Sequence, residues 1–121
     1  MIKGYFSEQD RVREIPIKDR TGKTLCLKLK GGMTPKGMTE KDRISFKINR
    51  VVWGQQTNVP DKIMLIEELL YDNVRKELRF GYRTQTHKKG SWWWGESALM
   101  APTNDIEELL QLAKEKGLIH V

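Results

Sequence analysis

Alternation of apolar and polar residues is the feature that most constrains the fold of this chain. Three segments have apolar side chains at alternate positions: residues 24–30 (Leu25, Leu27 and Leu29), residues 43–53 (Ile44, Phe46 and Ile48) and residues 77–85 (Leu78, Phe80 and Tyr82). Because successive side chains of a strand point to opposite faces, this period predicts three strands, each with an apolar face. Residues 11–18 are typical of a further strand, which Pro16 places at a sheet edge. A turn at residues 19–22 joins this strand to residues 24–30 in a hairpin.

Residues 61–73 fit two structures. Their apolar residues recur at helical spacings of three and four, yet the run is short for a helix. Asp72 and Asn73 make a good turn into the next alternating segment. We therefore expect a strand over residues 63–71, with a helix as the alternative.

The strongest helix signal lies at residues 104–117. Asn104 followed by Glu107 resembles a capping box, in which each side chain bonds the backbone of the other. Lysines near the other end suit the negative pole of the helix dipole. Gly117 is expected to end the helix, with Leu118 available for a contact back onto it.

Together these elements predict an α+β domain. We expect an antiparallel sheet of five or six strands, with the helix packed on one of its faces. A strand over residues 92–100, which begins with three consecutive tryptophans, completes the sheet. The 121 residues fit a single domain, 1–121, with strands between residues 10 and 100 and a helix at about 104–117.

The composition removes several functional classes. One cysteine in the chain excludes an internal disulfide framework and a cysteine-based zinc site. No apolar run approaches the roughly 18–20 residues that span a bilayer, and the first residues lack the apolar core of a signal peptide. We therefore expect a cytoplasmic protein with no membrane contact, no metal and no cofactor.

Candidate catalytic residues are few. His87 and His120 have no acidic residue placed to pair with them, and Cys26 has no histidine to activate it. Residues 32–39 carry the glycines and the threonine of a phosphate-binding loop, but Met38 stands in place of its lysine. We expect no catalytic residue and no nucleotide hydrolysis, so a binding domain is favoured over an enzyme.

Positive charge is concentrated in two parts of the sequence. The formal net charge is +6, and residues 1–50 carry 13 lysines and arginines against 6 acidic residues. A second basic stretch covers residues 75–89. Such a surface attracts phosphate backbones or an acidic protein surface. The alternative is a solvated face that serves solubility alone.

The alternating segments predict where this charge gathers. If their apolar sides all face the helix, five cations share the opposite side of the sheet: Lys28, Lys30, Lys47, Arg79 and Arg83. The turn at residues 86–91 adds Lys88 and Lys89 at its tip. An antiparallel sheet often leaves one face in water, so a polar face needs no function. A face with five cations and no carboxylate from the same strands is less usual, and it predicts phosphate contact.

The tryptophan run at residues 92–94 allows two strand registers. If residue 92 lies opposite residue 84, the outer two tryptophans join the core and Trp93 stands on the basic side. If residue 92 lies opposite residue 85, the outer two stand on the basic side instead. The apolar residues further along favour the first register. An indole among cations either packs against them or offers a base-stacking platform.

These observations lead to one function hypothesis and two rivals. We expect a small non-enzymatic domain that contacts nucleic acid, with the cations binding phosphates and Trp93 stacking on a base. The first rival is a protein-interaction or assembly module, whose contact is a sheet edge or the methionine-containing loop at residues 31–42. The second is an enzyme with a tryptophan-lined pocket.

Overall fold

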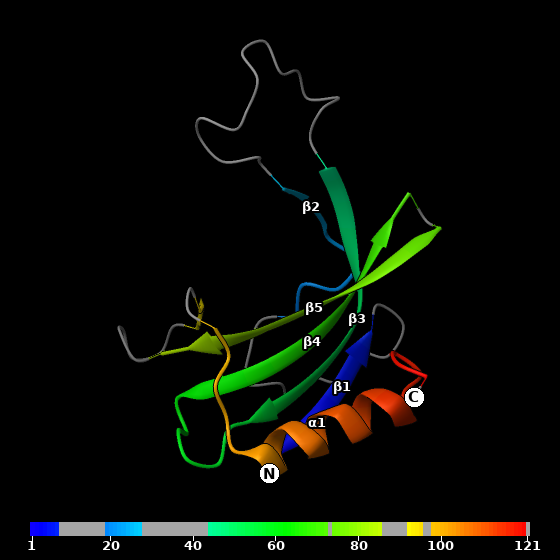
Figure 1. Ribbon diagram of the computed structural model, residues 1–121. Coiled ribbons are helices and arrows are strands. Elements are labelled where there is room, and N and C mark those ends of the chain that lie inside the picture. Colours follow the sequence, from blue (N-terminus) through cyan, green and yellow to red (C-terminus); the bar gives the residue numbers. More distant parts are fainter. Residues whose placement is uncertain (8–18, 28–43, 73, 86–91, 96–97, 121) are drawn as a thin grey trace.

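Figure 1 shows the computed structural model of the chain, which describes residues 1–7, 19–27, 44–72, 74–85, 92–95 and 98–120. Its elements are, in chain order, β1 (Lys3–Ser7), β2 (Thr24–Leu27), β3 (Ile44–Gln55), β4 (Lys62–Tyr71), β5 (Arg75–Thr84), β6 (Trp93–Trp94) and α1 (Thr103–Glu115). Within these described ranges the six strands form one antiparallel sheet, and one C-terminal helix follows them. The predicted α+β class is confirmed.

The sheet is built around β3 and β4, and its strands lie in the order β1-β3-β4-β5-β6. β1 pairs with residues 50–54 of β3, and β2 pairs with residues 44–47. These two short strands therefore lie end to end along one edge of β3. The sequence did not predict β1. The expected partner of β2, at residues 11–18, lies outside the described residues, as does the loop at residues 31–42.

The ambiguous segment forms β4, so the strand prediction is confirmed there. Its four residues from Ile63 to Ile66 are each at most 1% exposed, although they alternate between the two faces of the sheet. A strand that is buried on both sides loses the period of two, which explains why the sequence was ambiguous. The predicted turn follows: Asp72 has a positive φ of 51°, and the Val74 N–H donates to the Tyr71 carbonyl at 3.0 Å.

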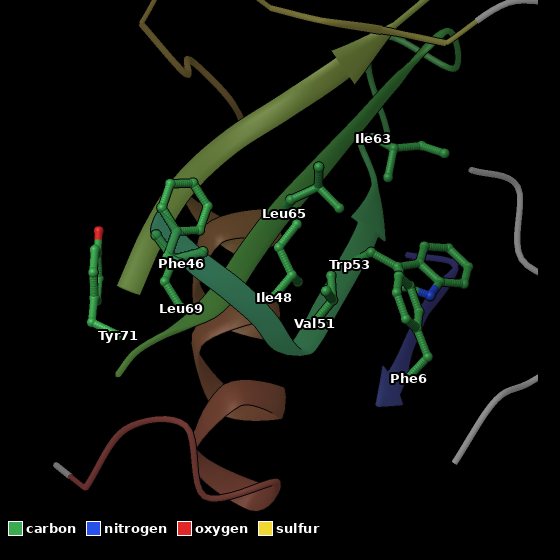
Figure 2. Packing of buried hydrophobic residues seen from close by; sticks show 9 residues of the cluster. All are labelled: Phe6, Phe46, Ile48, Val51, Trp53, Ile63, Leu65, Leu69 and Tyr71. Atoms are coloured by element: carbon green, nitrogen blue, oxygen red, sulfur yellow. The ribbon is translucent and has the colours of Figure 1, made fainter. Parts of the chain in front are cut away.

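The sheet has a hydrophobic core on each face. The far-side core, on the face away from α1, is shown in Figure 2 and consists of Phe6, Phe46, Ile48, Val51, Trp53, Ile63, Leu65, Leu69 and Tyr71. The helix-side core consists of Val52, Met64, Ile66, Leu109, Leu112, Ala113 and Leu118. From β4, Ile63, Leu65, Leu69 and Tyr71 enter the first core, and Met64 and Ile66 enter the second. The helix therefore covers only one of two apolar faces.

The helix ends as predicted and begins differently. Gly117 has a φ of +78°, and the Leu118 N–H donates to the Ala113 carbonyl at 2.8 Å, which closes the last turn. At the other end the capping-box prediction is wrong, because the N-cap is Pro102 and no side chain caps the first turn. The buried carboxylate of Asp105 instead accepts hydrogen bonds from the backbone and hydroxyl of Thr57, at 2.8 and 2.9 Å.

Candidate functional site

A buried carboxylate binds one of the predicted basic side chains of the sheet. Glu67 and Arg79 lie opposite each other on β4 and β5, and Arg79 Nε donates to Glu67 Oε1 at 2.9 Å. The Glu67 side chain is 4% exposed and that of Arg79 is 29% exposed. A carboxylate this deeply buried requires a charged partner. Arg79 is therefore bound into the sheet rather than free in solvent.

Trp94 packs against two arginines on the same face. Its ring lies 4.5 Å from the guanidinium carbon of Arg79 and 5.1 Å from that of Arg83. The ring also lies across Gly81, between these two arginines on β5, where a Cβ would overlap it. The glycine therefore leaves the space in which one indole contacts both guanidinium groups.

Arg83 and Arg20 meet Glu67 at a small cavity. The cavity measures about 10 Å³, and the charged residues share its wall with Phe6, Ile48, Val51 and Leu65. That is space for about one water molecule. We call Arg20, Glu67, Arg79, Arg83 and Trp94 the arginine–tryptophan cluster.

The positive charges of the cluster outnumber its negative charge. Burial lowers the pKa of Arg83, and the charges of Arg20 and Arg79 lower it further, while Glu67 acts in the opposite direction. Within the described part of the chain, Glu67 is the one carboxylate in this set against three guanidinium groups. The cluster therefore has a net positive charge.

The tryptophans adopt the second of the two registers. Arg83 lies opposite Trp94 and Thr84 opposite Trp93. The favoured register is therefore wrong: Trp94 faces the arginines, while Trp93 points to the other face, where it is 54% exposed. Trp92 also packs against the far-side core. The expected strand is shorter as well, since β6 comprises Trp93 and Trp94 alone.

The predicted basic face is divided between the two sides of the sheet. Lys47 lies opposite Leu70, whereas Arg79 lies opposite Glu67, and these two β4 residues are three positions apart. Lys47 and Arg79 therefore occupy opposite faces. Phe46 belongs to the far-side core rather than to the helix side. The prediction assumed one buried face, but both faces of this sheet are buried.

Phe80 was also misplaced. The sequence pattern put it in the core beside Leu78, which does pack on the helix-side core. Phe80 is instead 55% exposed. The remaining predicted site residues, Lys28, Lys30, Lys88 and Lys89, lie outside the described residues. Arg20 and Glu67 were not predicted as site residues. Glu67 could have been found, because it follows the apolar run Ile63–Ile66, where an acidic side chain needs a charged partner.

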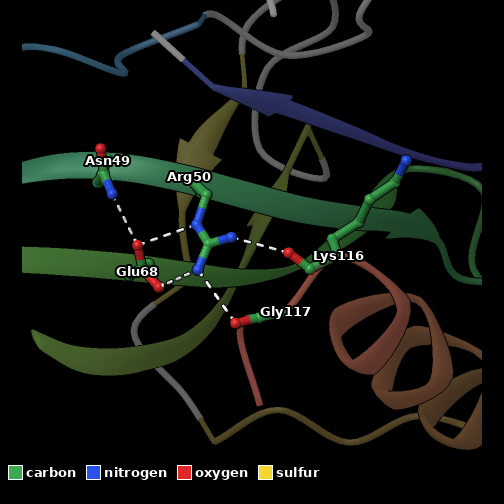
Figure 3. Close-up of polar contacts among 5 residues, drawn as sticks. All are labelled: Asn49, Arg50, Glu68, Lys116 and Gly117. Carbon is green, nitrogen blue, oxygen red and sulfur yellow. Dashed lines mark hydrogen bonds and ion pairs between the residues drawn. The ribbon is translucent and has the colours of Figure 1, made fainter. Parts of the chain in front are cut away.

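A second buried ion pair lies on the helix side, as Figure 3 shows. Arg50 Nη2 and Nε bind the two oxygens of Glu68 at 2.6 and 3.0 Å, and Asn49 donates to the same carboxylate. The guanidinium also donates to the carbonyls of Lys116 and Gly117, at 2.7 and 3.1 Å. Arg50 thereby connects two strands to the negative end of α1.

This second pair is electrically satisfied. Burial alone raises the pKa of Glu68, but hydrogen bonds from Arg50 and Asn49 outweigh it and lower the pKa. The bond to Glu68 raises the pKa of Arg50. Since each charge has its partner here, we assign this pair to stability.

The other candidate sites show fewer features of a binding site. A groove of about 500 Å³ is lined by Met1, Ile2, Gln55, Gln56, Thr57 and Pro60, with no tryptophan among them. In the part of the chain that the structure describes, no three His, Cys, Asp or Glu side chains are grouped to hold a metal ion. Nor does any helix there have the length and apolarity to cross a membrane.

Comparison with known proteins adds no relative to this description. No protein-family model, no curated protein and no solved structure matches the chain.

Proposed function

We propose that this chain binds the phosphate backbone of nucleic acid through the arginine–tryptophan cluster. The observation that carries the proposal is the charge imbalance: three guanidinium groups surround one carboxylate, and that carboxylate is already bound to Arg79. A phosphate oxygen near Arg83 supplies the missing negative charge, and guanidinium groups bind phosphate with directed hydrogen bonds. Contacts of this kind are independent of base sequence.

Trp93 supplies the stacking contact in this proposal. Its side chain is 54% exposed, whereas Trp94 is held against Arg79 and Arg83. A base that stacks on an exposed indole gains about 1–3 kcal/mol. Trp93 and Trp94 point to opposite faces of β6, which is two residues long. A strand that stacks on Trp93 therefore passes over this sheet edge to place a phosphate at Arg83.

Arg83 is the residue to change in testing this proposal. Replacing Arg79 leaves the buried Glu67 without its charged partner, so loss of binding would be confused with loss of fold. Arg83→Gln removes one positive charge from a cluster in which three guanidinium groups face one carboxylate. Arg83→Lys keeps the charge, and Lys114→Gln removes an exposed charge from α1 as a matched control.

The expected readout is the dependence of affinity on salt. For single-stranded DNA, each lost phosphate contact reduces the slope of log affinity against log salt by about 0.7. We expect that reduction, with weaker binding, for Arg83→Gln, and near wild-type slopes for Arg83→Lys and Lys114→Gln. Urea unfolding of every variant confirms that the fold is kept. An Arg83→Gln protein with wild-type affinity and slope contradicts the proposal.

A further inference from the structure

Among the described residues, the outer edge of β5 is paired only near its C-terminal end. β6 pairs with Arg83 and Thr84 only, and the Gly95 N–H donates to the Tyr82 carbonyl at 2.8 Å. In an antiparallel ladder, the N–H and C=O of one residue point to the same side and alternate along the strand. Since the Tyr82 carbonyl points away from β4, the backbone groups of Phe80, Leu78 and Lys76 point outward too. No described residue bonds these outward groups.

The side chains along this edge are unusually exposed for a strand of the sheet. Arg75, Lys76, Glu77 and Phe80 are all exposed, while β4 beside them is almost wholly buried. Phe80 leaves 55% of a large aromatic side chain in solvent. An exposed strand edge with an apolar side chain is a template for pairing with another strand.

The sequence of this edge is complementary to itself. When two copies of β5 pair antiparallel about a two-fold axis at Leu78, Lys76 lies opposite Phe80 of the second copy, and Glu77 lies opposite Arg79. Opposite charges and a cation beside an aromatic ring are both favourable cross-strand neighbours. Moving the axis by one residue sets Glu77 against Glu77 or Arg79 against Arg79, which is unfavourable.

We propose that this edge pairs with the same edge of a second copy of the chain, centred on Leu78. This is the one register in which all three outward-facing residues pair with one another, which forms about six backbone hydrogen bonds across the axis. The contact is isologous and closes on itself, so it produces a dimer rather than a fibre. The two sheets become one continuous sheet.

Cysteine cross-linking tests this register directly. In a Cys26→Ser background, Lys76→Cys and Phe80→Cys are made as separate proteins, both at exposed positions. Residue 76 faces residue 80 of the partner, whereas two copies of residue 76 lie roughly 13 Å apart along the strands. We therefore expect a disulfide-linked dimer when the two proteins are mixed and oxidised, and none from either protein alone.

Two other outcomes overturn the proposal. Equal cross-linking in the single-variant samples shows random collision or another register, and no cross-linking in the mixture shows that the edges do not meet.

Sedimentation of the nucleic-acid-free wild type provides an independent measurement, with a dimer expected to form as concentration rises. Phe80→Lys places a lysine opposite Lys76 and is expected to remain monomeric, with circular dichroism confirming its fold. A wild type that is monomeric at its highest soluble concentration also contradicts the pairing.

Discussion

The indole of Trp94 occupies the space that a side chain would need at Gly81 on the neighbouring strand. Just beyond the end of β6 the reverse contact occurs, with the ring of Tyr82 on β5 lying against Gly95. Each glycine is covered by an aromatic ring of the facing segment. This exchange places Trp94 over β5, between the two arginines of the candidate site.

Gly81→Ala is expected to destabilise the protein by about 1–3 kcal/mol, because the added methyl group forces the indole out of its place. Urea unfolding measures the effect. The same substitution in a Trp94→Ala background is expected to cost less, since the ring with which it overlaps is gone. Equal costs in the two backgrounds would show that Trp94 is not the group displaced.

At the start of α1, substitutions of two neighbouring residues are expected to change stability by different amounts. Asp105→Ala removes the acceptor for the Thr57 N–H and hydroxyl, so we expect a loss of about 1–3 kcal/mol of unfolding free energy. Asn104 makes no capping hydrogen bond, so Asn104→Ala is expected to change stability by less than about 0.5 kcal/mol. Thermal or urea unfolding of the two variants decides this, and a larger loss at Asn104 would restore the capping-box interpretation.

The lowered pKa of Glu68 makes the stability of the protein depend on pH. Its pKa is lowered in the folded protein, so its contribution is present above its unfolded value of 4.5 and is lost as pH falls through the folded pKa. Glu68→Gln is expected to lose about 3 kcal/mol at neutral pH, because Arg50 keeps its charge without a carboxylate partner. Below pH 4.5 the stabilities of the variant and the wild type are expected to converge. Unfolding curves collected from pH 7 to pH 3 test this, and a constant difference would contradict it.

The tryptophans differ in their access to solvent. Trp93 is 54% exposed, whereas Trp53 is 6% exposed and Trp94 is packed against the far-side core. Trp93→Phe is therefore expected to remove most of the emission that acrylamide quenches, with less than about 0.5 kcal/mol lost in stability. Trp94→Phe is expected to leave that quenching in place. The opposite pattern would mean that Trp94 is the accessible indole.

Local patterns in the sequence predicted most of the elements. The strand at β4, the turn after it and the glycine that ends the helix all follow from signals within a few residues. β1 was missed because its five residues include Gly4 and alternate poorly, and pairing with β3 is what stabilises it. Asp105 shows the same limit, since its partner Thr57 lies 48 residues away in the chain.

The faces of the sheet could not be predicted in the same way. The register of β3 shifts between Ile48 and Arg50, so residues on either side of Asn49 do not follow one simple alternation. Apolar cores on both faces remove the contrast that identifies a solvent side. Arg79 and Arg83 were correctly placed together, but their carboxylate partner comes from β4, which the analysis of the basic face left out.

We propose that the arginine–tryptophan cluster and Trp93 contact nucleic acid. The most direct measurement is the tryptophan emission of the wild-type protein during titration with single-stranded DNA, RNA and duplex. Each titration is made at about 50 and 200 mM salt, a range over which phosphate-driven binding weakens steeply. We expect saturable quenching at the lower salt concentration and a large loss of affinity at the higher one. Unchanged emission with all three ligands at low salt would contradict the account.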